Sequence, residues 1–358
     1  MALRRSLLAV LVVAAIVVVG GFLLATRPDL RTAVGLVRST TYDNPVLDRD
    51  FPDPAVLAEP VDGWWYAYAT QSLTADGRDI DLQAARSRDL VTWEHLGDVL
   101  PTKPGWAAST QDFWAPHVVA RDGRYVMYYS AAPDDGDGLC LAIATAVTPS
   151  GPFVDVGAPL ECGRTFTDID PMAFEDPADG RWWLFWGSGF EPIQARELAP
   201  GGLAFAPGST PSVVLEPDPY LPYENLIEGA WVVAREGSYY LFYSGDSCCE
   251  NPRYAVLVAR SRALLGPYEK LVAPSESDSA AILEQDGPWQ APGHNSVVTD
   301  AAGQDWLLYH AIDRAERFGP NDSLVRKMLL DRVIWIDGWP AVERGVASDG
   351  SRAGPIVP

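Results

Sequence analysis

The chain has 358 residues, of which 47% are hydrophobic, and a formal net charge of −21. Residues 1–40 contain five arginines and one aspartate, so the rest of the chain carries −25. A domain that acidic repels phosphate backbones and anionic lipid, which excludes nucleic acid as a partner and leaves a neutral polysaccharide acceptable. Thirty-one glycines and thirty prolines favour many short strands and turns around one large core.

The N-terminal segment is predicted to export the rest of the chain. Arg4 and Arg5 precede an uninterrupted apolar run, Leu7–Ala25. At about 1.5 Å per residue, a helix of this run spans a bilayer, and its end offers only a poor cleavage site for signal peptidase. We therefore predict that residues 1–40 hold a transmembrane signal-anchor and a linker, with the following domain outside the cytoplasm. A cleaved signal peptide, which would make the protein secreted, is the alternative.

One pattern then occurs five times: a tight turn containing glycine, followed by an aromatic strand. An Asp-Gly pair between apolar runs favours a hairpin, because the two-residue turn needs positive φ. A hairpin repeated about every sixty residues is typical of a four-stranded propeller blade with long loops. We predict an all-β, five-bladed β-propeller over residues 41–343, followed by a C-terminal tail, 344–358, and a monomeric protein. The turns are Asp62-Gly63, Asp122-Gly123, Asp179-Gly180, Glu236-Gly237 and Ala302-Gly303.

A short motif stands at the start of each repeat, where the innermost strand of the blade is expected. These side chains should converge at one mouth of the propeller axis. Three of the motifs supply a carboxylate, from Asp53, Asp170 and Glu228, and clustered acids among aromatic rings suit general acid–base chemistry on a sugar. Asp168 is the main competitor of Asp170, and Glu224 that of Glu228. The motifs are Phe51-Pro52-Asp53-Pro54, Trp114-Ala115-Pro116-His117, Ile169-Asp170-Pro171, Ile227-Glu228-Gly229 and Ala291-Pro292-Gly293-His294-Asn295.

The three acidic motifs resemble the catalytic signatures of glycoside hydrolase family 43. Further matches in the right order extend the resemblance from about Asn44 to Val342; they include 87–94, 114–117, 266–268 and 337–340. The resemblance implies a five-bladed propeller and an inverting glycosidase, most often one that degrades arabinan or xylan. It implies that Asp53 is the general base that activates water and Glu228 the general acid. Asp170 would be the third acid, which orients the general acid and keeps its pKa high.

The expected substrate is an arabinofuranose-containing polysaccharide of the arabinan or arabinoxylan type. Two other classes of function stay open. One is a related propeller enzyme, such as a β-xylosidase, a fructofuranosidase or another cell-wall furanoside hydrolase. The other is a carbohydrate-binding propeller without catalysis, which the presence of all three acids disfavours.

Four further residues are predicted to contact the substrate. Phe113 and Trp114 precede an axial motif, where they would form a wall for sugar stacking. By resemblance, Arg332 matches the arginine that family members place near the sugar hydroxyls, with a salt bridge to a neighbouring aspartate as the alternative. His294 matches a histidine that faces the axis and, in some members, binds a calcium ion mainly through water. No cofactor is required, and His117 and His310 are interpreted as structural.

The four cysteines suit an exported protein, where disulfides form. Cys140 and Cys162 lie in and after one predicted blade and are placed to pair across neighbouring strands. Cys248 and Cys249 are adjacent, so they form either a vicinal bridge or two free thiols.

Overall fold

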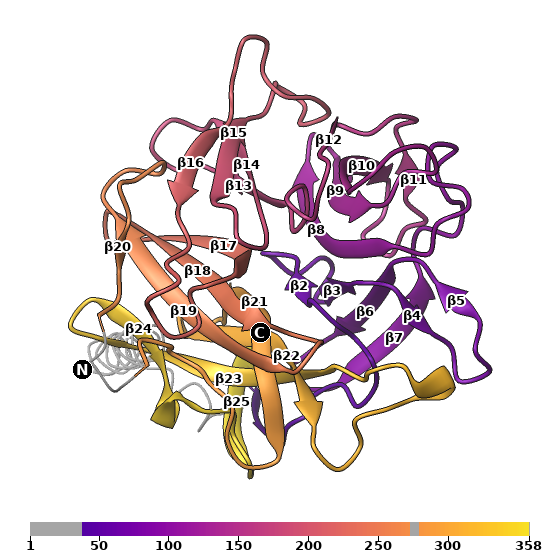
Figure 1. Ribbon diagram of the computed structural model, residues 1–358. Coiled ribbons are helices and arrows are strands. Elements are labelled where there is room, and N and C mark those ends of the chain that lie inside the picture. Colours follow the sequence, from indigo (N-terminus) through magenta and orange to yellow (C-terminus); the bar gives the residue numbers. More distant parts are fainter. Residues whose placement is uncertain (1–37, 273–278, 358) are drawn as a thin grey trace, which may run out of the picture.

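The computed structural model describes residues 38–272 and 279–357. Within these residues, five antiparallel sheets are arranged around a central axis, so the predicted five-bladed propeller is confirmed (Figure 1). No helix among them is long and apolar enough to cross a membrane. The predicted anchor, Leu7–Ala25, lies outside the described residues.

Each blade uses consecutive strands, with the first strand nearest the axis. The first blade contains β2 (Ala55–Val56), β3 (Trp65–Ala69), β6 (Gln83–Ser87) and β7 (Trp93–Asp98), and the second β8 (Phe113–Arg121), β9 (Arg124–Ala131), β10 (Cys140–Ala146), β11 (Val154–Asp155) and β12 (Glu161–Cys162). The third contains β13 (Met172–Glu175), β14 (Trp182–Trp186), β15 (Ile193–Glu197) and β16 (Ser212–Leu215), and the fourth β17 (Ile227–Arg235), β18 (Ser238–Ser247), β19 (Arg253–Ser261) and β20 (Glu269–Lys270). The fifth contains β21 (Trp289–Thr299), β22 (Asp305–Asp313), β23 (Lys327–Ile336) and β24 (Trp339–Val342). The small β4 (Ser72–Leu73) and β5 (Asp79–Ile80) pair with each other, and two 3-10 turns, η1 (Pro320–Asp322) and η2 (Glu343–Gly345), complete the described elements.

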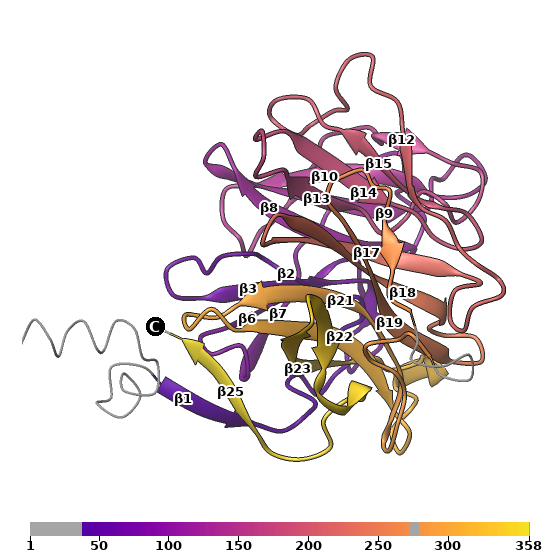
Figure 2. The same cartoon turned by 90° about the vertical axis from the view of Figure 1, so that its left-hand side faces the viewer.

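The segment 344–358, expected as a tail, contains a strand. β25 (Arg352–Val357) pairs with β1 (Arg38–Tyr42), and the two lie side by side in Figure 2. The backbone N–H of Ile356 donates to Asp300 of the fifth blade (2.9 Å). Between Val46 and Phe51, backbone N–H groups donate hydrogen bonds to the carbonyls of Met328 and Arg326, at the start of β23 in the fifth blade. Both chain ends therefore tie the first and fifth blades together.

The aromatic strands fill the space between blades. In the second strand of each blade, one aromatic side chain is at most 1% exposed. Burial of a large apolar side chain stabilises by roughly 1.5–3 kcal/mol, and the tyrosine hydroxyls among these residues all donate a hydrogen bond, for example from Tyr309 to Asp331 (2.7 Å). These rings are Tyr68, Tyr129, Trp186, Tyr243 and Tyr309.

The innermost strands share an unusual backbone position. Each blade has a residue with a positive φ in or just before its innermost strand, beside a bulge in β8, β17 and β21, and β21 has a second one, Ala291 (50°). Bulges re-aim side chains, and left-handed residues other than glycine concentrate at functional sites. The five residues are Asp53 (56°), Ala115 (46°), Asp170 (60°), Gly229 (63°) and His294 (47°). The three predicted acids lie at this position or directly before it.

A second set of residues joins neighbouring blades at the same mouth. Each directly follows the aromatic part of a second strand and contacts the innermost segment of the next blade. Thr70 accepts from the N–H of Ala115 (2.8 Å), and Ser188 donates to Glu228 (2.6 Å). Ser244 accepts from the N–H of His294 (2.7 Å), and His310 accepts from the N–H of Asp53 (3.1 Å). Side chains from all round the axis thus fix the acids relative to one another.

The structure contains the expected Cys140–Cys162 bridge and, of the two alternatives for Cys248 and Cys249, the vicinal bridge. Cys140 and Cys162 lie opposite each other on β10 and β12 and form a disulfide within the second blade. Cys248 and Cys249 form a vicinal disulfide in the loop between β18 and β19.

Candidate active site

Asp53 lies at the mouth of the axis, in a nearly closed environment. Its residue is 7% exposed. The hydroxyl of Thr70 donates to Oδ2 (2.5 Å), and Nη1 of Arg326 donates to Oδ1 (3.1 Å). Nδ1 of His310 and of His294 lie 3.1 Å and 3.4 Å from the same oxygen. The hydroxyl of Thr70 and the guanidinium of Arg326 therefore bind this carboxylate, and two imidazole rings lie against it.

These contacts determine the protonation state of Asp53. Burial by itself would raise its pKa, but the Arg326 guanidinium, followed by His294 and His310, lowers the pKa well below its ordinary value. Burial lowers the pKa of His310 to about 4, so this imidazole is neutral at neutral pH. Asp53 therefore stays ionised over the whole range in which a base is needed.

Glu228 is held by two hydroxyl groups instead of cations. Tyr254 donates to Oε1 (2.6 Å), and Ser188 donates to Oε2 (2.6 Å). Gly229 follows it with a φ of 63°, and a Cβ at that glycine would lie 3.3 Å from the His294 ring. Neutral hydroxyls fix the orientation of a carboxyl group without demanding that it be ionised. The environment of Glu228 thus differs in kind from that of Asp53.

Asp170 interacts electrostatically with both of these acids. Its Oδ2 accepts from the backbone N–H of Gly229 (3.0 Å) and lies 3.9 Å from Nδ1 of His294. Burial, then the charges of Glu228 and Asp53, raise its pKa well above the ordinary value. Asp170 therefore orients the peptide that carries Glu228 through the N–H of Gly229.

The two competing acids are engaged elsewhere. Asp168 accepts from the indole N–H of Trp186 (3.0 Å), and burial raises its pKa to about 6. Glu224 is 1% exposed, accepts from the hydroxyl of Tyr243 (2.7 Å) and forms an ion pair with Lys270. Both carboxylates have structural partners, so the assignment of Asp170 and Glu228 to the site is the better one.

His294 was expected to face an axial calcium ion. Behind the acids, a cavity of about 20 Å³ is lined in part by His294, Asn295 and Asp170. Both amide atoms of Asn295 are buried and lack a hydrogen-bond partner in the described residues. A cavity of this size holds one water molecule, whereas calcium takes six to eight oxygen ligands. Among the described residues no group of three or more His, Cys, Asp or Glu side chains is arranged for a metal; calcium held by His294 mainly through water stays a prediction, with a structural histidine as the alternative.

The aromatic side chains beside the acids are not the predicted pair, Phe113 and Trp114: Trp114 is joined by Phe166 instead. Trp114 is half-buried and lines a cavity of about 220 Å³ next to Asp53, together with Thr70 and Arg326. Its ring stacks on Phe166 (centroids 5.4 Å apart, 20° between planes), a residue 60% exposed. Phe113 is fully buried and packs against Tyr129. The contact prediction for Phe113 is therefore wrong, because successive residues of a strand point to opposite faces.

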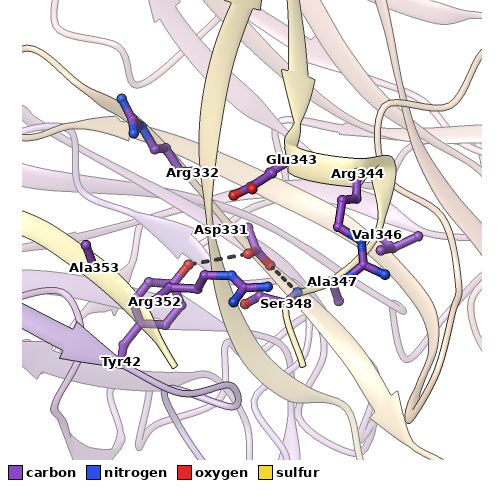
Figure 3. A pocket seen from close by; sticks show the side chains of 10 residues that line it. All are labelled: Tyr42, Asp331, Arg332, Glu343, Arg344, Val346, Ala347, Ser348, Arg352 and Ala353. Carbon is purple, nitrogen blue, oxygen red and sulfur yellow. Dashed lines mark hydrogen bonds between the residues drawn. The ribbon is translucent and has the colours of Figure 1, made fainter. Parts of the chain in front are cut away.

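Arg332 also lies away from the acids. It is exposed on β23, where its Nε donates to Gln304 (2.7 Å). Figure 3 shows Arg332 lining a separate pocket of about 130 Å³ around the buried carboxylate of Asp331. Arg326, immediately before the same strand, is the arginine that reaches Asp53. Arg332 lies six residues further along, within β23, and its guanidinium reaches Gln304 instead of Asp53.

The histidines separate into two roles. His117 is buried, accepts from the N–H of Ala173 (3.2 Å) and has a pKa lowered to about 3 by burial, as its structural interpretation requires. His310 was interpreted in the same way, but its ring lies against Asp53 and therefore belongs to the site.

Comparison with known proteins agrees with this arrangement. The model of the glycosyl hydrolases family 43 matches residues 42–340. The chain is 26% identical over 301 residues to the extracellular endo-alpha-(1->5)-L-arabinanase 1 of Bacillus subtilis, covering 81% of this chain and 86% of that one. It is 28% identical over 298 residues to the beta-D-galactofuranosidase xynD of Aspergillus niger, covering 80% and 81%.

A solved structure shows the same fold. The family 43 protein BlXynB of Bacillus licheniformis superimposes with a TM-score of 0.70 at 22% identity. The match covers 89% of this chain and 60% of that chain. A buried carboxylate kept ionised, a second one held by hydroxyls, and a family match across the whole propeller lead to one conclusion: the chain belongs to glycoside hydrolase family 43 and is a glycosidase.

Proposed function

We propose that the enzyme hydrolyses α-L-arabinofuranosidic bonds in arabinan- or arabinoxylan-type polysaccharide, with inversion at the anomeric carbon. Asp53 takes a proton from water as the water attacks the anomeric carbon, and Glu228 gives its proton to the departing glycosidic oxygen. Asp170 positions Glu228 through the N–H of Gly229. The stacked pair Trp114 and Phe166 offers a sugar-binding face beside the acids.

The observation that carries the proposal is the contrast between two carboxyl groups at one mouth. Arg326, His294 and His310 surround Asp53, whereas hydroxyl groups hold Glu228. The two carboxyl groups thus lie in different electrostatic environments, as separate base and acid roles require. All these groups come from one chain, so we propose a monomeric enzyme. The arabinanase from Bacillus subtilis supports the choice of substrate.

A panel of substrates tests the proposal. We expect turnover of 4-nitrophenyl α-L-arabinofuranoside and of linear arabinan, with the product's anomeric configuration inverted when followed by NMR. The panel includes the β-D-galactofuranoside, because a relative of similar identity is named for that activity, and the β-D-xyloside and β-D-fructofuranoside. A preference for one of these glycosides would replace the arabinofuranoside as the proposed substrate. Retention of configuration would overturn the roles of Asp53 and Glu228. Binding of arabinan without turnover of any glycoside would identify a carbohydrate-binding propeller.

Asp170→Asn is expected to move the alkaline limb of the pH–rate profile to lower pH. This limb reports loss of the last proton shared by Asp170 and Glu228, and two adjacent negative charges delay that loss. A neutral amide at residue 170 removes the repulsion, so the last proton leaves earlier. The measurement is kcat against pH, and kcat should change more than KM. An unchanged limb with a large rise in KM would make Asp170 a substrate-binding residue.

We also propose that residues 1–40 anchor the enzyme to the membrane, with the propeller outside the cell. The argument is the apolar run Leu7–Ala25 behind Arg4 and Arg5, and the extracellular location in the name of the Bacillus subtilis relative agrees with export. Fractionation should recover the full-length chain in the membrane pellet, with the propeller open to external protease. A soluble protein that begins near Thr26 would show that the segment is a signal peptide.

A further inference from the structure

The vicinal disulfide Cys248–Cys249 lies beside the active site. It occupies the loop that joins β18 and β19 in the fourth blade. Cys248 is half-buried and faces the site, whereas Cys249 is exposed. The loop is attached to the hairpin by a hydrogen bond from the hydroxyl of Ser247 to the carbonyl of Glu250 (2.6 Å). The bridge therefore presents one sulfur to the catalytic mouth and one to solvent.

Cys248 contacts the side chain that holds the general base. Its Sγ lies 4.0 Å from Nη1 of Arg326, and the same nitrogen donates to Oδ1 of Asp53 (3.1 Å). The backbone N–H of Arg326 donates to Asp50 (2.9 Å), so its main chain is fixed from the other side. The long side chain of Arg326 is thus confined between Asp53 and the sulfur.

Cys248 also packs against a small cluster that includes Tyr254, the residue that holds the general acid. It adjoins the small cluster formed by Tyr254, Ala291 and Ile312. Tyr254 stacks on His310 (5.7 Å between centroids, 10° between planes) and donates to Oε1 of Glu228 (2.6 Å). One loop residue therefore contacts Arg326, which holds Asp53, and packs against the cluster that contains Tyr254, which holds Glu228; the two carboxyl groups stand on different blades.

We propose that the Cys248–Cys249 disulfide is a positioning element of the catalytic site, which holds Arg326 against Asp53 and Tyr254 against Glu228, and whose reduction lowers turnover. This inference rests on the roles proposed above for Asp53 and Glu228. Breaking the bridge frees two adjacent residues of the loop, so Cys248 no longer fixes its neighbours. A displacement of a catalytic group by about 1 Å costs as much as 100-fold in rate.

Loss of the bridge should shift the pH dependence of turnover in one direction. Arg326 is the largest of the contributions that favour the ionised form of Asp53. If Arg326 moves away, Asp53 protonates at a higher pH and the acid limb of the pH–rate profile moves up. The charged and titratable groups that face Asp53 from the surrounding elements are Arg326, His294, His310, Asp50, Asp170 and Tyr254.

The test compares two double variants of equal chemistry. Cys248→Ser/Cys249→Ser removes the bridge at the site, and Cys140→Ser/Cys162→Ser removes the bridge within the second blade. For the first we expect kcat on 4-nitrophenyl α-L-arabinofuranoside to fall by a factor on the order of 10 to 100, with the acid limb moved up and KM changed less. For the second we expect both kcat and the acid limb to match the unmodified protein, whatever its melting temperature.

A reductant supplies the second arm. In Cys140→Ser/Cys162→Ser the remaining pair is Cys248 and Cys249, because the chain has four cysteines. A dithiol such as dithiothreitol gives up two electrons and two protons as it closes to its own disulfide, and the Cys248–Cys249 bond takes them up to give two thiols. Intact mass should then rise by two hydrogens while kcat falls as in the serine variant, and removal of the dithiol under oxidation should restore it.

Two results would overturn the proposal. One is an unchanged acid limb and kcat in Cys248→Ser/Cys249→Ser, with or without a lower melting temperature. The other is full activity in the reduced control variant after mass spectrometry has shown the two thiols. Carboxyl ¹³C NMR of Asp53, assigned with Asp53→Asn, gives a readout independent of turnover. If the unmodified protein hydrolyses no glycoside, the proposed function fails, whereas an equal Asp53 titration with and without the bridge rejects the positioning role.

Discussion

Asp53→Ala is expected to abolish turnover of both arabinan and aryl arabinofuranosides, with a loss in kcat on the order of 10²- to 10⁴-fold. The substitution removes the base that activates water, and every substrate needs that water. Azide, which attacks without being deprotonated, should restore part of the turnover of aryl substrates. The product of this rescue is a glycosyl azide of inverted configuration, which mass spectrometry and NMR detect.

A matched control separates loss of the base from loss of structure. Asp168→Asn changes a carboxylate that is buried to the same degree as Asp53, since Asp168 is 8% exposed and Asp53 7%. Its partner is the Trp186 indole and not a group of the substrate cavity. It should lower the melting temperature and keep kcat within a few-fold. Retention of wild-type kcat in Asp53→Ala, or a rescue product that retains configuration, would remove Asp53 from the role of base.

Glu228→Ala is expected to show a loss that depends on the leaving group. Arabinan needs a proton on its departing oxygen and should lose roughly 10²- to 10⁴-fold in kcat. An aryl glycoside whose phenol is strongly acidic departs without that proton and should lose far less. The measurement is the dependence of log kcat on the pKa of the leaving phenol, which should become steeper in the variant.

Glu224→Gln serves as the control for Glu228→Ala. Glu224 is buried beside Tyr243 and Lys270, so its loss should affect the melting temperature without changing the leaving-group dependence. Equal losses for all substrates in Glu228→Ala would reject Glu228 as the acid and reopen the choice between the carboxyl groups of the site.

The repeat is the part of the fold that the sequence predicts best. Asp62-Gly63 (51° and 73°) and Asp122-Gly123 (50° and 73°) adopt the positive φ that a two-residue turn requires, whereas in Asp179-Gly180 only the glycine does (74°). The aromatic runs after these turns are strands that are largely buried. The motif before each turn leads into or lies on an innermost strand, so Asp53, Asp170 and Glu228 reach the same mouth. Local turn geometry and a period of two along strands are sufficient to place them.

The residues that support the acids occupy the same place in each sequence repeat. Each aromatic run is followed, directly or after one or two residues, by a small polar residue or a histidine: Thr70, Ser130, Ser188, Ser244 and His310. Four of these bind the innermost segment of the next blade. Aligning the five repeats with one another identifies this position, whereas examination of each motif alone does not.

The sequence by itself determined the blade count and the convergence of the motifs that carry Asp53, Asp170 and Glu228, because these follow from the period of the repeat; it left the pairing of Cys140 with Cys162 as one of three connectivities. Only the tertiary structure decided which arginine meets Asp53, which hydroxyls hold Glu228 and what surrounds Cys248. Arg326 reaches Asp53 across a separation of 273 residues, and Tyr254 comes from a different strand of the blade than Glu228. Such contacts arise where the first and last blades meet and where loops fold over the axis, and no local pattern encodes them.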